Sequence, residues 1–233
     1  MGHMVAKDIY GALGDKIDNL HVRTPQTEAF YAMLRELYSP DEAELIVAMP
    51  FGLSTLERIA KVTGRDRKEL EPMLAALCDK GLVVDVRLGD SYHYMPAPFV
   101  IGIFEFTMMR MDHSDPDIGK VSRLFVDYLE SGEFYAANFK DGQQVSVEFL
   151  DYEKVERIVD AAGTFSLSNC SCRHKKLHAG GQVCKVPLET CTSFGSAADY
   201  LVRHGMGREI SQSEMKDVVQ RSKELKLVFS VDN

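Results

Sequence analysis

Four of the five cysteines in this chain lie in one short segment, NCSCRHKKLHAGGQVCKVPLETC, residues 169–191. They follow the spacing C-x-C-x11-C-x6-C and are Cys170, Cys172, Cys184 and Cys191. Four thiolates complete the coordination of a tetrahedral zinc ion or of a cubane iron–sulfur cluster. The segment therefore predicts a metal centre, and disulfides or unligated thiols are the remaining alternatives.

The spacing of the first two cysteines bears on which metal centre it is. Structural zinc sites usually take their first two ligands from C-x2-C or a wider pair. In an extended chain, Cys170 and Cys172 would point to the same side with their α-carbons about 6.5–7 Å apart. That separation suits two irons of a cluster at least as well as one zinc ion. The spacing favours a 4Fe-4S cluster, with zinc as the alternative.

Basic side chains surround these thiols. They are Arg173, His174, Lys175, Lys176, His178 and Lys185. A cluster held by four thiolates is an anion, so basic neighbours and backbone N–H groups would stabilise it and raise its reduction potential. We predict Arg173 and Lys175 as cofactor-binding residues for this reason. Gly181 joins them because a glycine lets the backbone approach closely.

Residues 24–97, ahead of the cysteines, carry helix signals followed by a hairpin signal. A polar cap is followed three residues later by glutamate in three places: Ser39 with Glu42, Ser54 with Glu57, and Asp66 with Glu69. Gly64 and Gly81 mark helix ends. The alternating segment 82–95, with the turn LGDS, predicts a β-hairpin. Helices followed by a hairpin are the order of a winged helix-turn-helix, so we predict a winged-helix-like domain here.

The fifth cysteine, Cys78, belongs to the last helix of that region. It falls on the apolar side beside Leu74 and Leu77. A free cysteine in such a place behaves as a small hydrophobic residue. We interpret Cys78 as a core residue and not as a fifth ligand.

The rest of the chain divides into three parts. Residues 1–23 read as a tag remnant, GHM before a valine, and an N-terminal arm. Residues 98–143 read as a helical connector, with a buried helix over 100–111 and a second helix capped by Asp115.

Residues 144–233 form the four-cysteine domain, in which strands and helices alternate. Strands are predicted over 144–150 and 164–168 and at the end of the chain, and helices over 151–163, 195–205 and 211–226. The predicted fold class is α+β, with a winged-helix-like N-terminal domain followed by a small α/β cysteine-cluster domain.

Composition narrows the function classes. The chain has 233 residues with 45% hydrophobic content, enough for two small domains. With a net charge of -8, the chain does not have the excess of positive charge that is typical of DNA-binding proteins. No apolar run approaches the roughly 20 residues that span a membrane, and the start has no signal-peptide core. We expect a cytoplasmic protein, in whose reducing surroundings clustered cysteines favour metal over disulfides.

Three motifs together resemble the signature of a known family. CSCRHKK, CKVPLETC and FGSAADYLVRHGMGREIS are similar to segments of 4Fe-4S-binding proteins of anaerobic bacteria and archaea, which have a winged-helix-like N-terminal region. The similarity covers about residues 30–230. It implies that Cys170, Cys172, Cys184 and Cys191 ligate the cluster. Relatives often continue with a ferredoxin module, whose C-x2-C-x2-C run is absent from the sequence given, so a relay through several clusters is not implied for this chain.

These observations predict an iron–sulfur protein that transfers electrons or serves as a redox accessory protein in anaerobic metabolism. The alternatives are a redox- or metal-responsive winged-helix transcription regulator and a zinc-stapled interaction module. No motif of a nucleophile, a phosphate-binding loop or a dinucleotide site stands out, so catalysis by the chain itself is not predicted. We expect a protein redox partner, neither DNA nor a membrane as a partner, and leave a homodimer open.

Overall fold

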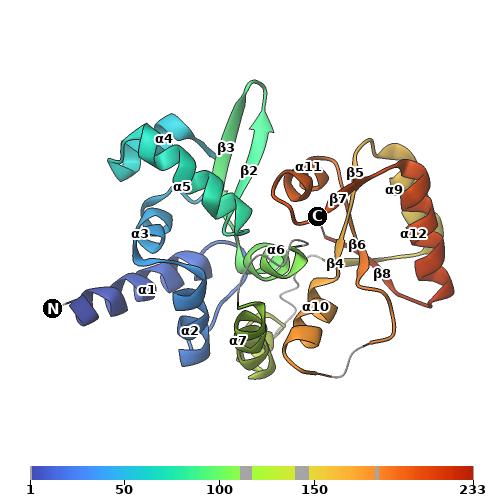
Figure 1. Cartoon of the computed structure of the whole chain (residues 1–233), viewed down its shortest axis with the longest axis horizontal. Coiled ribbons are helices and arrows are strands. Elements are labelled where there is room, and N and C mark those ends of the chain that lie inside the picture. Colours follow the sequence, from blue (N-terminus) through green and yellow to red (C-terminus); the bar gives the residue numbers. More distant parts are fainter. Residues whose placement is uncertain (1, 111–116, 140–146, 182–183, 233) are drawn as a thin grey trace.

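The protein is described here from a computed structural model, which covers residues 2–110, 117–139, 147–181 and 184–232 (Figure 1). It is a mixed helix and sheet structure, which confirms the α+β class. No helix in the described ranges is both long and apolar enough to cross a membrane.

The N-terminal part contains five helices and a small sheet. The helices are α1 (Gly2–Asp18), α2 (Glu28–Leu37), α3 (Pro40–Ala48), α4 (Leu56–Thr63) and α5 (Arg67–Asp79). The hairpin of β2 (Val83–Leu88) and β3 (Ser91–Pro96) confirms the predicted hairpin. The short strand β1 (Ser54–Thr55) pairs with β3, so the antiparallel sheet has the order β1-β3-β2.

Local capping signals were predicted correctly in two of three places. The Ser39 side chain accepts from the Glu42 N–H, and Glu42 accepts from the Ser39 N–H in return. Asp66 caps α5 by accepting from the Lys68 N–H at 2.8 Å. Ser54 as the cap of α4 was wrong. Thr55 caps that helix by accepting from the Arg58 N–H, because the helix begins at Leu56, one residue later than the pattern predicts.

The N-terminal arm is more ordered than the sequence suggests. The structure has the helix α1 where no element is predicted. The side chains of Leu13 and Ile17 are fully buried in the core and Tyr10 donates a hydrogen bond to the Tyr38 carbonyl at 2.7 Å. Part of the segment 1–23 therefore belongs to the folded body.

The middle of the chain is helical, but less continuously than predicted. Of the helix expected over 100–111, only α6 (Phe104–Met109) is regular, because Val100 and Ile101 just before it have extended backbones. The helices α7 (Ile118–Glu130) and α8 (Glu133–Asn138) follow. The described start of α7 is capped by Asp117, and the predicted cap Asp115 lies outside the described residues.

The C-terminal part alternates strands and helices, and it contains three elements that were not predicted, over 171–178, 189–194 and 208–210. In order they are β4 (Val147–Leu150), α9 (Tyr152–Ala161), β5 (Phe165–Asn169), α10 (Ser171–His178), β6 (Glu189–Phe194), α11 (Ser196–Arg203), β7 (Arg208–Ile210), α12 (Gln212–Glu224) and β8 (Phe229–Asp232). A central antiparallel sheet has the order β6-β5-β7, and β4 pairs with β8. Residues 144–146 of the first predicted strand lie outside the described ranges.

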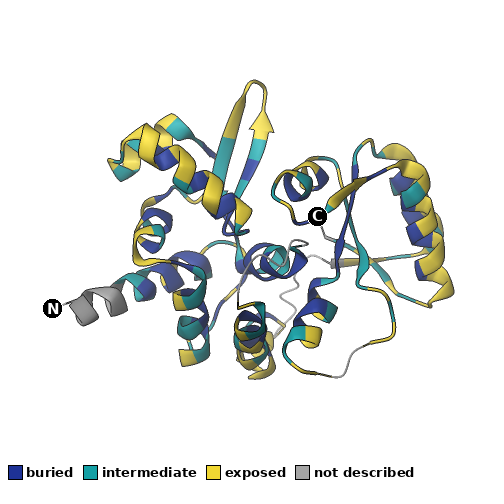
Figure 2. Cartoon of the chain, viewed as in Figure 1, coloured by how far each residue is buried: buried dark blue, intermediate teal, exposed yellow. Residues whose placement is uncertain are grey.

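Two hydrophobic cores hold these parts together, and Figure 2 shows the buried residues on the inner faces of the helices. The larger core spans the N-terminal and middle helices, and the smaller one lies between α9, α12 and β5. Helix α11 comes from the cysteine region but packs Tyr200 and Leu201 into the larger core. Apolar contacts therefore cross the predicted domain boundary at residue 144.

Candidate metal centre

The first two predicted ligands lie at the start of a helix. The extended chain assumed for Cys170 and Cys172 is wrong, because α10 begins directly after β5 and includes Cys172. Cys170 occupies the position before its first helical residue, and its carbonyl accepts from the His174 N–H at 2.8 Å. Cys172 is exposed in the first turn. The side of α10 away from solvent packs against α6 and α7, which fixes the direction in which this turn points.

Strand pairing brings a third ligand to the same place. Cys191 lies in β6, where it pairs with Ser168 of β5, two residues before Cys170. The register shifts between Ser168 and Asn169, and the Cys170 N–H donates to the Leu188 carbonyl at 2.7 Å. As a result Cys172 and Cys191 are the thiols that most strongly affect the ionisation of Cys170. We call Cys170, Cys172 and Cys191 the cysteine trio.

Cys170 is the member of the trio that ionises most readily. Hydrogen bonds from Cys172 and Cys191 lower the pKa of Cys170, and the backbone N–H and the charge of Arg173 lower it further. Interaction with Cys170 raises the pKa of Cys172 and of Cys191, and burial adds to the rise at Cys191. The Ser171 N–H also points to the sulfur of Cys191. The positive end of α10 therefore faces the sulfurs, which is the polarity that stabilises thiolates and other anions.

Cys184 stands apart from the trio. It is exposed in the irregular segment between α10 and β6, just after residues 182–183, which are not described. Within the part of the chain that the structure describes, the thiols that affect the ionisation of Cys170 are those of Cys172 and Cys191. The fold thus gathers three of the four predicted ligands and leaves the fourth on the adjoining segment.

The three predicted cofactor-binding residues have different positions. Arg173 donates to the Thr190 hydroxyl at 2.6 Å, and its charge acts on Cys170. Lys175 is buried, and burial lowers its pKa while the nearby Cys172 opposes that change. Gly181 lies after the last turn of α10, where its N–H donates to the Lys176 carbonyl at 3.0 Å. Arg173 and Lys175 are therefore near the trio, and Gly181 is at the other end of the helix.

One residue near the trio has no signal in the sequence. The carboxylate of Glu105, in α6, raises the pKa of Cys172, and it accepts from the Gly102 N–H at 3.0 Å. It reaches the trio because α6 packs against α10. A residue so distant in sequence could be found only from the fold.

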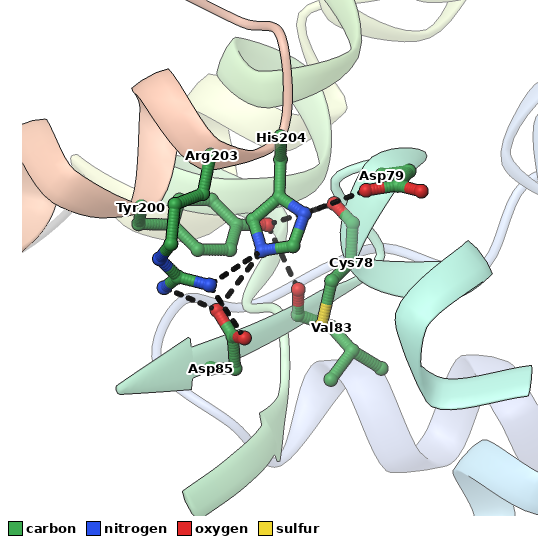
Figure 3. Close-up of polar contacts among 7 residues, drawn as sticks. All are labelled: Cys78, Asp79, Val83, Asp85, Tyr200, Arg203 and His204. Carbon is green, nitrogen blue, oxygen red and sulfur yellow. Dashed lines mark hydrogen bonds and ion pairs between the residues drawn. The ribbon is translucent and has the colours of Figure 1, made fainter. Parts of the chain in front are cut away.

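A second cluster surrounds Cys78, which the sequence presents only as a core residue (Figure 3). Arg203 donates two hydrogen bonds to Asp85, at 2.8 and 2.9 Å. Burial raises the pKa of Asp85, but hydrogen bonds from His204 and Arg203 outweigh it and bring the pKa to about 2. Burial lowers the pKa of His204, and its bonds to Asp85 and Asp79 raise it more. Asp85 is therefore an ionised, buried carboxylate.

Comparisons with known proteins give no further information on the function of this chain. No family model, no curated protein and no solved structure matches the chain.

Proposed function

We propose that this protein binds one 4Fe-4S cluster through Cys170, Cys172, Cys184 and Cys191, and that it works as an electron carrier or redox accessory protein. The observation that carries the proposal is the cysteine trio, which the start of α10 and the pairing of β6 with β5 bring to one region of the fold. Cys184 completes the set from the exposed segment beside it. All five cysteines are free thiols, so none of these donors is used in a disulfide.

The donor set fits an anionic cluster. When bound, a cluster of this type accepts and releases one electron at a time. The backbone N–H groups of Ser171 and Arg173 favour the thiolate forms of Cys191 and Cys170, which are the forms that bind a cluster. The charges of Arg173 and Lys175 offset the negative charge and favour the reduced state. The likeness of the cysteine motifs to the 4Fe-4S family supports the same assignment.

The N-terminal part is, in this proposal, a winged-helix-like module that docks a protein redox partner. The helices α3, α4 and α5 with the sheet β1-β3-β2 support that description. Two of its basic residues are already paired with acids: Arg65 with Asp41 at 2.6 Å and Arg67 with Glu57 at 2.8 Å. DNA binding needs a run of uncompensated positive charge, so these pairs favour a protein partner over the regulator.

The experiment compares single cysteine variants of the full chain, reconstituted anaerobically with iron and sulfide. We expect a brown wild type whose visible absorption is bleached by dithionite. Cys170→Ser, Cys172→Ser, Cys184→Ser and Cys191→Ser should each lose most of that absorption. Cys78→Ala is the matched control, because Cys78 lies outside the trio, and it should keep the absorption.

Two results would contradict the proposal. One is a colourless wild type that binds zinc through the same four cysteines, which would favour the zinc-stapled module. The other is full absorption in Cys184→Ser, which would show that this cysteine is not a ligand. Protease cleavage near Lys176 adds a readout of local order, since metal binding supplies folding free energy to such segments.

A further inference from the structure

The cluster around Cys78 brings together three metal-ligating side chains from separate elements (Figure 3). Cys78 comes from the last turn of α5, Asp85 from β2, and His204 from the end of α11. The Cys78 sulfur, an Asp85 carboxylate oxygen and an imidazole nitrogen of His204 all lie within 4.8 Å of one another. Cys78 is 0% exposed and Asp85 6% exposed, so this is not a chance group of surface acids.

A fourth side chain orients the histidine. Nδ1 of His204 lies 2.7 Å from Oδ1 of Asp79, which leaves Nε2 directed at Asp85, 3.0 Å from its Oδ1. Metal-ligating histidines are commonly held in this way, with a carboxylate on the ring nitrogen that does not bind the ion. Two ligands at the usual 2.0–2.1 Å from one tetrahedral zinc ion lie about 3.3 Å apart. The observed separation of Nε2 and Oδ1 is close to that value.

The charges also suit a divalent ion. A zinc ion, the Cys78 thiolate, the carboxylates of Asp79 and Asp85 and the guanidinium of Arg203 sum to neutrality. Nη1 of Arg203 lies 3.2 Å from Nε2 of His204, so zinc binding requires the guanidinium to turn away from this nitrogen while it keeps a hydrogen bond to Asp85, whose accepting oxygen retains a second lone pair. One sulfur, one nitrogen and one oxygen donor form a set that zinc takes readily and that hard cations such as Mg²⁺ do not prefer.

We propose that Cys78, Asp85 and His204 bind one zinc ion, at a site separate from the four-cysteine centre, with Asp79 as the residue that positions His204. A water molecule or the second Asp85 oxygen fills the fourth coordination position. The ion fastens the hairpin and α5 to α11, the helix that follows the Cys191 strand. The site is thus a structural clamp between the N-terminal part and the cysteine region.

The test is made in a full chain in which Cys170, Cys172, Cys184 and Cys191 are all replaced by serine. This background binds no cluster, so its result does not depend on the proposed function. Cobalt(II) alone and zinc alone are the probes. We expect one ion per chain and, with cobalt, a thiolate-to-metal charge-transfer band in the near ultraviolet. Adding Cys78→Ala should abolish the band and most of the binding.

Two further measurements cover the case in which the serine background does not fold. The first is Asp79→Asn in the wild-type chain, where the substituted side chain is 61% exposed and is outside the predicted ligand set. It should weaken zinc binding about 10–100-fold, the usual effect of losing such an orienting group. The second is zinc content per chain in the wild type and in Cys78→Ala, both carrying the four-cysteine centre.

The outcomes are distinct. Loss of one zinc in Cys78→Ala with unchanged iron supports the clamp. The proposal is overturned if neither the wild type nor Cys78→Ala contains stoichiometric zinc, or if the cobalt spectra are equal with and without the Cys78 thiol. The side chains around Cys78 would then form an ion-pair network only. Loss of iron with one zinc per chain retained in Cys184→Ser supports a zinc site that is separate from the four-cysteine centre.

Discussion

Gly207 packs closely against β5, the strand that leads to the cysteine trio. An added methyl group at Gly207 should therefore clash with this strand. A Cβ at this position would lie 2.5 Å from the Ser168 hydroxyl oxygen and 3.2 Å from the Leu167 carbonyl oxygen. Ser168 pairs with Cys191 and stands two residues before Cys170. Gly207→Ala therefore presses on β5 at the point that sets the geometry of the trio.

The magnitude follows from opposing effects. Overpacking of a well-packed site costs about 1–3 kcal/mol. Replacing glycine by alanine also restricts the unfolded chain, which returns about 0.4–1 kcal/mol. We expect a net loss of about 1–2 kcal/mol in the free energy of unfolding. For a chain of this length, that is a fall in Tm of roughly 2–8 °C.

The assay is thermal and urea unfolding of the full chain with two reference variants. Gly163→Ala is the matched control, because no atom lies within 4 Å of its added Cβ. Ser168→Ala removes the atom that clashes, and it should cost little alone, since that buried hydroxyl has no hydrogen-bond partner in the described part of the chain. The double variant Ser168→Ala, Gly207→Ala should recover a large share of the loss.

Two findings would refute this reasoning. Equal Tm values for Gly207→Ala and Gly163→Ala would show that the close approach is absent in solution. A loss in the double variant equal to the sum of the two single losses would show that Ser168 and Gly207 do not interact.

Two other predictions concern charges. Burial raises the pKa of Glu42, but hydrogen bonds with Lys80 and Ser39 lower it more, so the folded value lies below the unfolded one. The resulting stabilisation is complete above the unfolded pKa of about 4.3 and is lost as pH falls through the folded value. Glu42→Gln should therefore lower the free energy of unfolding by about 1 kcal/mol at neutral pH and leave it unchanged at low pH. Urea unfolding at the two pH values measures this, and an equal loss at both would contradict the prediction. Lys175→Met should lower the reduction potential of the cluster-loaded chain in an anaerobic redox titration, because a buried positive charge near Cys172 is lost; an unchanged potential would exclude that role.

Local signals explain which parts of the fold the sequence could predict. The capping box of Ser39 and Glu42 and the helix end at Gly64, whose φ is 69°, depend only on neighbouring residues. The hairpin over 82–95 is likewise a local pattern. Ser54 failed as a cap because the helix begins one residue later than the pattern predicts, so that Thr55 takes the position before the first helical residue.

The candidate site shows the same division. The spacing of the cysteines was enough to predict four ligands, and the structure brings three of them together. Helix α10 was not predicted, because its polar and basic sequence has no apolar periodicity. Cys78 was predicted as core, and its burial agrees with that. Its contact with His204 could not be foreseen, since α11 reaches it only through packing into the larger core.

The central claim is that the four-cysteine segment holds an iron–sulfur cluster. The most direct measurement is the content of iron, acid-labile sulfide and zinc per chain in protein purified without oxygen. The account predicts about four iron and four sulfide per chain, both lost in Cys184→Ser. A wild-type chain without iron or sulfide, even after anaerobic reconstitution, would contradict it.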